Sequence, residues 1–310
     1  MKRKYFVFAA IATMLASCSK DEERVQQDIF KDTPIAVSVD VAELISRAGY
    51  ANDNLPATFY LTIDQDGDKY DYADVAVVKA DDSDVYTPQQ TVLWESSSPA
   101  TAMAATFNLA EELELMVETD QSTEEDLENS DHLYMASVSV DPADTEGVIP
   151  VGFEHIMSKV NLTVNFGGEF EAEENPITSI AFKGTLPGRT YDYSKEVAAQ
   201  WTDIEDVEPA DIIPLEGEFV AADEAEETMA AVSYEVLLVP QTVAAHGFAV
   251  EFIIGGQSYT WRSDDAVTLE GGYQYNLTLT VGKEKMDEIS FSTSAWGDGG
   301  HVNKNTEITE

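Results

Sequence analysis

The sequence predicts an all-β protein made of β-sandwich domains, and three observations lead to this prediction. Apolar and polar residues alternate with a period of two in many short runs, which is the pattern of half-buried strands. The longer periodicity of helices is scarce in the same chain. Turn residues separate the runs, and many short strands separated by turns are typical of β-sandwiches.

The first expected strand covers residues 35–41 (IAVSVDV) and has one apolar face. Ile35, Val37, Val39 and Val41 lie on that face, and the residues between them lie on the other. Burial of these four side chains at ~1.5–3 kcal/mol each predicts a stabilisation of roughly 6–12 kcal/mol. The further expected strands cover residues 59–63, 133–140, 159–166, 177–184, 234–240, 273–281 and 288–296.

Three connecting segments also carry sequence signals. Residues 248–262 predict a hairpin that turns at Gly255 and Gly256. The segment DQDGD at 64–68 predicts an Asp-Gly turn after a strand, because its glycine stands fourth whereas a calcium loop needs it sixth. The acidic stretch 110–129 predicts either a short helix or a solvated loop.

A domain boundary is expected near Gly167 and Gly168, because the acidic segment EFEAEEN follows them directly. The boundary divides the chain into an N-terminal sandwich over 35–167 and a C-terminal sandwich over 168–310, whose last residues form a polar tail.

The first 17 residues predict a secretory signal peptide. Lys2, Arg3 and Lys4 precede an apolar run over 5–15, which is about half the ~20 residues needed to span a bilayer. The run ends in Leu-Ala-Ser-Cys, which resembles the bacterial lipoprotein lipobox, and Cys18 is the sole cysteine of the chain. We therefore expect cleavage before Cys18 and lipid attachment to its thiol; the alternative is an ordinary signal with an incidental cysteine.

Residues 18–34 are expected to form a lipidated tether. Ser19 to Glu23 resembles a short acidic tag that sends some lipoproteins to the outer face of Gram-negative cells, although a plain solvated tether has the same composition. Two or three acyl chains would hold the protein firmly, at about 0.8 kcal/mol per buried CH₂. The expected location is the cell outer membrane, as a surface-exposed lipoprotein.

The charge of the chain excludes one class of partner. Lys and Arg number 17 and Asp and Glu 59, so the formal net charge is −42 and the surface repels phosphate backbones. No nucleic-acid partner is expected, and attachment to the outer membrane must come from the lipid. A hydrophobic content of 44% still predicts a folded core rather than disorder.

No motif for catalysis, cofactor or metal binding is found in the sequence. The four histidines form no H-x-x-x-H or H-E-x-x-H pattern, and there is no nucleophile elbow, phosphate loop or dinucleotide fingerprint. We therefore expect no enzyme, no cofactor and no metal. The tryptophans are not clustered in sequence, so core packing is expected for each rather than a sugar-binding platform; they are Trp94, Trp201, Trp261 and Trp296.

Three segments together resemble the fimbrillin family. Residues 151–166 (VGFEHIMSKVNLTVNF) contain a Phe-x-His, a Ser-Lys and an alternating strand, and residues 130–137 (SDHLYMAS) resemble the segment that precedes them in that family. The C-terminal segment 273–300, with its Trp-x-x-Gly, is also similar. The resemblance implies two tandem transthyretin-like Greek-key β-sandwich domains and a subunit of type V pili, or a relative of one. It also implies a location in the fimbrium if the chain polymerises.

The resemblance further implies proteolytic processing and strand exchange. In that family a protease cuts after an arginine beyond the first strand, and Arg47, followed by Ala48, stands at the matching position. The cut would release the strand of 35–41, and the C-terminal strand of a neighbour would fill the groove. The donor candidates are Ile289, Phe291, Thr293 and Ala295. Alternatively, Arg47 merely ends a strand at a loop, and the donor segment belongs inside its own domain.

Two function hypotheses follow. The first is a structural or adhesive pilus subunit whose partners are other pilin subunits, of this chain or a related one. The second is a non-polymerising surface lipoprotein that binds glycan or another ligand on host or bacterial surfaces. A third class, a hydrolase that uses scattered carboxylates, lacks a motif.

Overall fold

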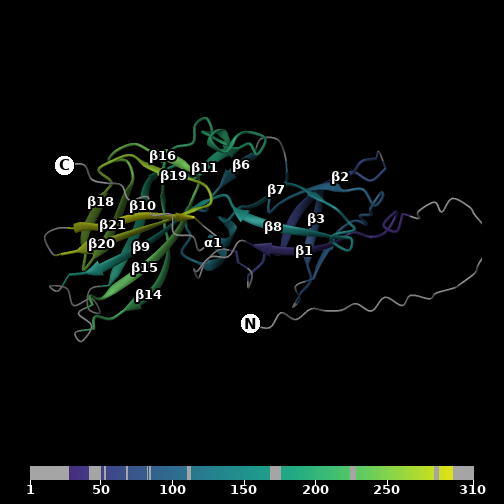
Figure 1. The fold of residues 1–310 in the computed structure, drawn as a ribbon. Helices are drawn as coiled ribbons and strands as arrows, with labels where there is room; N and C mark the ends of the chain where they lie inside the picture. The colour runs from purple at the N-terminus through teal and green to yellow at the C-terminus, as the bar shows by residue number, and fades with distance from the viewer. Residues whose placement is uncertain are drawn as a thin grey trace, which may run out of the picture.

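A computed structural model describes residues 28–41, 50–51, 54–67, 69–81, 83, 85–109, 113–167, 176–223, 228–282 and 286–295 of the chain. The side chains of 286–290 and 295 are not described. Strands dominate these residues, so the all-β prediction is confirmed. Figure 1 shows the strands in two halves along one long axis. The transthyretin-like Greek-key connectivity stays a prediction.

The first half is built on a seven-stranded sheet with the order β1-β8-β7-β5-β2-β3-β4. Its strands are β1 (Ala36–Val41), β2 (Thr58–Asp64), β3 (Tyr72–Lys79), β4 (Tyr86–Pro88), β5 (Ala100–Ala105), β7 (Leu133–Val140) and β8 (Val148–His155). Alternate residues of β2 are fully buried, as a strand with one core-facing side requires. They pack with Trp94 and Phe153 in what we call the first core.

The second half contains a five-stranded sheet with the order β14-β15-β9-β20-β21 and a four-stranded sheet with the order β13-β10-β17-β18. The strands of the former are β9 (Ser158–Phe166), β14 (Leu215–Val220), β15 (Ala231–Leu238), β20 (Tyr273–Val281) and β21 (Met286–Ala295). Those of the latter are β10 (Ile177–Thr185), β13 (Ala210–Ile212), β17 (Ala249–Ile254) and β18 (Gln257–Arg262). Their apolar faces form the second core.

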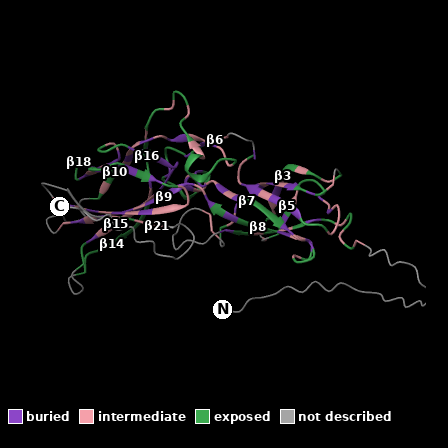
Figure 2. Ribbon diagram, turned by 45° about the horizontal axis from the view of Figure 1, so that its top comes forward, coloured by how far each residue is buried: buried purple, intermediate pink, exposed green. Residues whose placement is uncertain are grey.

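Small elements complete the second half. A three-stranded sheet joins β6 (Leu113–Met116) and β12 (Trp201–Thr202) on either side of β11 (Gly188–Tyr191). A further pair consists of β16 (Gln241–Val243) and β19 (Val267–Leu269). The described helices are α1 (Glu124–Asn129) and the 3-10 turn η1 (Val197–Ala199). Buried residues follow the strands, and the connecting loops are mostly exposed (Figure 2).

The expected strands are all observed, although some of their bounds differ by a few residues. The hairpin turn is confirmed at Gly255 and Gly256, which both have positive φ (56° and 82°). The acidic stretch holds β6 and α1, and Thr123 caps the helix by accepting a hydrogen bond from the Asp126 N–H. Several strands were not expected, β8 among them, because Pro150 and Gly152 interrupt its apolar pattern.

The two cores divide the chain differently from the expected boundary at 167/168. Strand β9 lies before that boundary, yet it pairs with β15 and in parallel with β20, and Val160, Leu162 and Val164 are fully buried in the second core. Residues 113–127 also contribute to this core. Long-range pairing therefore places both segments with the C-terminal half.

Candidate strand-exchange site

Strand β1 lies at one edge of the seven-stranded sheet. It pairs in parallel with β8, from Ala36 against Val148 to Val41 against Phe153. Its apolar residues share a face, as expected from the alternation. A parallel ladder to one neighbour is its main attachment to the sheet, and this edge position is the one that the strand-exchange hypothesis requires.

The burial of β1 is smaller than expected. Ile35 and Val41 are buried, at 4% and 1% exposure, but Val37 and Val39 are only half-buried. The expectation of four buried residues is therefore wrong for the two in the middle, because an edge strand is covered less completely than a central one. Two full and two half contributions amount to roughly 4–9 kcal/mol.

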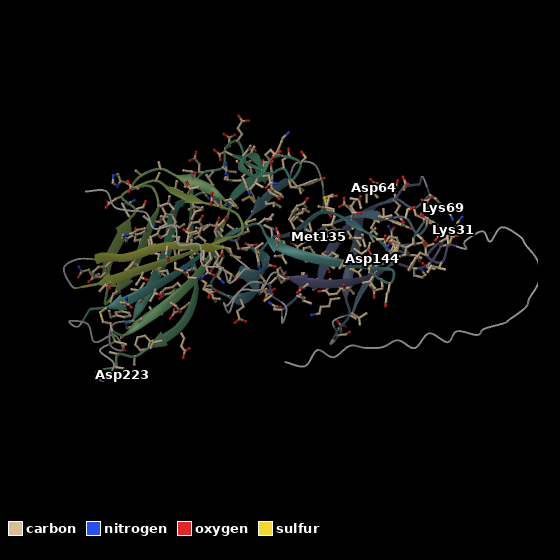
Figure 3. All side chains as sticks on the ribbon, viewed as in Figure 1. Lys31, Asp64, Lys69, Met135, Asp144 and Asp223 are labelled. Atoms are coloured by element: carbon tan, nitrogen blue, oxygen red, sulfur yellow. The ribbon has the colours of Figure 1, made fainter. Side chains whose placement is uncertain are left out.

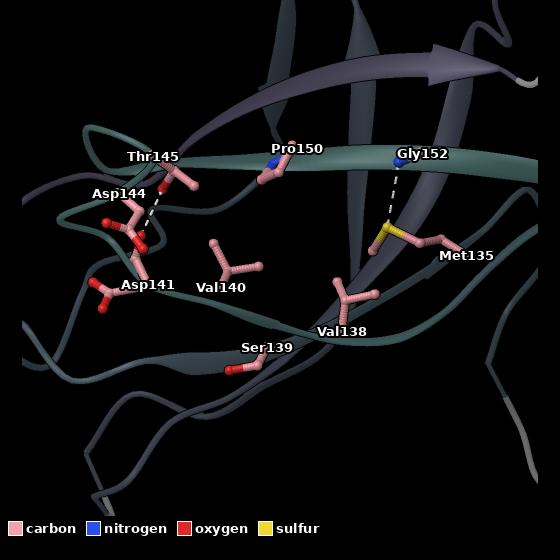
Figure 4. Close-up of a pocket in the computed structure, with 9 residues that line it drawn as sticks. All are labelled: Met135, Val138, Ser139, Val140, Asp141, Asp144, Thr145, Pro150 and Gly152. Carbon is pink, nitrogen blue, oxygen red and sulfur yellow. Dashed lines mark hydrogen bonds between the residues drawn. The ribbon is translucent and has the colours of Figure 1, made fainter.

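Strand β8 is held in the sheet mainly by β1, because β8 diverges from β7 along most of its length. The two strands pair at only two positions, Leu133 with His155 and Tyr134 with Glu154. Farther along, Pro150 has no N–H to donate, and the Gly152 N–H donates to the Met135 sulfur at 3.4 Å (Figure 4). Removal of β1 would leave those two pairs as the ladder that joins β8 to the sheet.

A slot of about 470 Å³ separates β7 from β8. Figure 4 shows Val138 and Val140 on its β7 side and Pro150 on its β8 side. Val138 is 39% exposed, although β7 lies in the interior of the sheet order. The sequence signal for this feature was a proline inside an apolar run, which is rare in a strand paired on both sides.

The segment that precedes β1 is bound to the first core. The Asp32 N–H donates to the Trp94 carbonyl at 2.8 Å, and the Trp94 N–H donates to the Thr33 carbonyl at 2.9 Å. The Lys69 ammonium lies 2.7 Å from Asp32 and lowers the pKa of that carboxyl; Figure 3 shows this lysine at one end of the molecule. Residues 28–34, expected as part of the lipidated tether, thus contact the first core through Phe30, Asp32 and Thr33, while most of the segment stays exposed.

The candidate donor segment is β21. It pairs antiparallel with β20, from Tyr273 against Ala295 to Val281 against Met286, and forms the edge of the five-stranded sheet. Phe291 and Thr293 are half-buried, and the Phe291 ring stacks on Tyr275 with centroids 5.9 Å apart. The segment therefore has a place in its own half, and the structure does not bring it together with β1 (Figure 1).

Cys18, Arg47 and Ala48 lie outside the described residues, and so do the side chains of Ile289 and Ala295. The nearest described residue beyond Arg47 is Tyr50.

The segments that suggested the family meet in a buried cluster at the junction of the two halves. His155 Nδ1 lies 2.9 Å from Asp131 Oδ1, and both side chains are fully buried. The Tyr50 N–H donates to the other oxygen of Asp131 at 2.9 Å. These contacts connect the start of the first half to the ends of β7 and β8.

A second buried pair lies on the neighbouring strands of the second half. Lys159 Nζ is 2.7 Å from Glu235 Oε2, and the lysine side chain is fully buried whereas that of Glu235 is 20% exposed. Burial lowers the pKa of Lys159, and Glu235 opposes this effect. Within each cluster the buried charged side chain pairs with a neighbouring side chain of the same cluster, which is typical of structural ion pairs.

The part of the chain that the structure describes offers no metal cluster and no membrane-spanning helix. No group of three or more His, Cys, Asp or Glu residues there could hold a metal ion. No helix there is long and apolar enough to cross a membrane.

Comparison with known proteins gives one family. A family model described as fimbrillin-like matches residues 49–296. No curated protein sequence matches. The solved structure of a candidate cell adhesion protein from Bacteroides ovatus has 13% identity and a TM-score of 0.61, over 86% of this chain and 98% of that one. One from Bacteroides uniformis has 14% identity and a TM-score of 0.59, over 86% and 99%. At these identities the similarity concerns the fold.

Proposed function

This chain belongs to the fimbrillin-like family, and we propose that it is a structural or adhesive subunit of a cell-surface pilus that exchanges an edge strand with other pilin subunits. One observation carries the proposal: β1 is an edge strand, and its partner β8 pairs with the rest of the sheet at only two positions. The names of the two structural relatives, both candidate cell adhesion proteins, agree with it. The proposal includes no catalytic step.

The route to the surface starts at Cys18. The lipobox-like sequence supports a lipid-modified N-terminus, and the acidic residues after it support transfer to the outer face of the outer membrane. Cleavage after Arg47 would separate this anchor and β1 from the rest of the chain. The contacts of Asp32 and Thr33 with Trp94 must then break as well, so release follows cleavage as a separate step.

The vacated edge of β8 would accept an extended strand from a neighbour. Main-chain hydrogen bonds provide affinity in such strand addition, and alternate side chains provide specificity. The β21 segment is our donor candidate, because it is an edge strand of its own sheet and Phe291 and Thr293 point to one face. A head-to-tail contact of this kind does not close on itself, so repeated exchange extends a filament.

The test is the N-terminus of polymerised material. Wild-type filaments should begin at Ala48, and Arg47→Ala should leave a folded, lipid-bound monomer. Arg47→Lys is the matched control for charge at the cleavage position, and an arginine-specific protease should leave it uncut as well. Filaments that contain the whole chain from Cys18 would overturn strand exchange through Arg47. A complete absence of filaments would favour the non-polymerising surface lipoprotein.

A further inference from the structure

A large cleft lies at the junction of the two halves, outside the strand-exchange site. Its cavity volume is about 1590 Å³, and it is lined by β7 and β8 from the first half and by β11, β12 and the start of β20 from the second. Single-ligand pockets are usually of ~300–1,000 Å³, so this cleft has room for an extended ligand. Figure 1 shows β11, β16 and β19 together on one side of the molecule.

Aromatic side chains line this cleft from separate elements. Tyr191 is buried, and its ring centroid lies 4.8 Å from that of Trp201 and 6.1 Å from that of Tyr134. Trp201 is only half-buried, in contrast to Trp94 and Trp261, which are core residues as expected. Trp201 packs against the second core, as expected, but is only partly covered there. It lies on a two-residue strand opposite Tyr191 and also lines the cleft.

A fixed polar group stands beside the aromatic rings. The Arg189 guanidinium donates to Asp203 Oδ1 at 2.8 Å, to the Pro240 carbonyl at 2.6 Å and to the Trp201 carbonyl at 3.2 Å. Its side chain is 15% exposed. These three bonds set the orientation of the guanidinium before any ligand arrives, which lowers the entropy cost of binding. Glu154, also in the lining, is exposed and can accept hydrogen bonds.

We propose that this cleft binds a neutral oligosaccharide. A sugar ring has an apolar face that packs on aromatic rings and a rim of hydroxyls that bond to planar polar groups, and Trp201, Tyr134 and Arg189 offer this combination. The charge of the chain indicates a neutral ligand, because a net charge of −42 disfavours anionic polymers such as nucleic acids and sulfated or uronic glycans. A cleft with comparable polar and apolar walls is unsuited to a purely apolar ligand.

The experiment uses the full chain purified in detergent and an array of short neutral oligosaccharides, followed by calorimetric titration of the best ligand. Trp201→Ala should weaken binding about tenfold or more through loss of the aromatic contact. Trp201→Phe keeps a ring and should lose less. Phe219→Ala is the matched control, because Phe219 is 40% exposed on β14, away from the cleft, and its loss should leave affinity unchanged.

Two results would overturn the proposal: no oligosaccharide binds at roughly millimolar concentration, or Trp201→Ala binds as tightly as wild type. Binding of a lysine-rich peptide with no binding of any oligosaccharide would assign the cleft to a cationic partner and also overturn it. Pilus assembly tests the proposed function separately. Trp201→Ala should assemble normally, so a failure of saccharide binding and a failure of strand exchange can be told apart.

Discussion

Replacement of Asp131 by alanine is expected to destabilise the junction between the two halves. The carboxylate is fully buried and accepts two hydrogen bonds, from His155 Nδ1 and from the Tyr50 N–H, each at 2.9 Å. Alanine removes both acceptors and leaves the donors in place. The variant therefore tests whether this buried cluster supports the fold.

The magnitude follows from the number of donors and their burial. A buried donor that loses its acceptor costs ~1–3 kcal/mol, so two donors give roughly 2–6 kcal/mol. Tyr50 is only half-buried and its N–H can be solvated more easily, so we expect about 2–4 kcal/mol. Asp131→Asn keeps one acceptor and should cost less, about 1–2 kcal/mol.

The assay combines two measurements. Urea denaturation followed by tryptophan fluorescence reports on both cores, because Trp94 lies in the first and Trp261 in the second. Hydrogen exchange of the Tyr50 amide reports on the lost bond itself and should accelerate roughly tenfold or more in Asp131→Ala. An alanine variant within about 0.5 kcal/mol of wild type, with unchanged exchange at Tyr50, would refute the reasoning.

Three further predictions concern single positions. Burial lowers the pKa of His132 from its ordinary 6.5, so the unfolded chain binds this proton more tightly than the folded chain does. The free energy of unfolding therefore falls as the pH drops below ~6.5. His132→Gln should flatten the decline in thermal stability between about pH 7 and pH 5. Gly184 has φ +85° and an added Cβ would overlap the carbonyl oxygen of Gly247, so Gly184→Ala should cost at least about 2 kcal/mol in urea denaturation, and a neutral result would contradict the strain. Glu235→Ala should lower the free energy of unfolding by about 3 kcal/mol, because it leaves Lys159 buried without this partner. Adding Lys159→Met should recover most of that stability. A double variant as unstable as the single variant would show that the ion pair is not the cause.

Local patterns in the sequence predicted much of the fold. The alternation in 35–41, 159–166 and 273–281 identified strands and their apolar faces, and the double glycine at 255–256 identified a hairpin. These predictions succeed because side chains of a strand alternate between two faces whichever strand lies beside it. The Phe-x-His and Ser-Lys motifs, with the strand that follows them, indicated the family because they are short local motifs that can be read directly from the sequence.

Only the tertiary structure decided which strands are neighbours. The parallel pairing of β1 with β8, the slot between β7 and β8, and the inclusion of β9 in the second core all join segments far apart in the chain. The contact between Asp131 and His155 and the half-exposed position of Trp201 also arise from such pairing. Periodicity indicates which face of a strand is apolar. The choice of partner strand depends on the burial and hydrogen bonding of all the strands together, and the sequence of a single segment does not determine these.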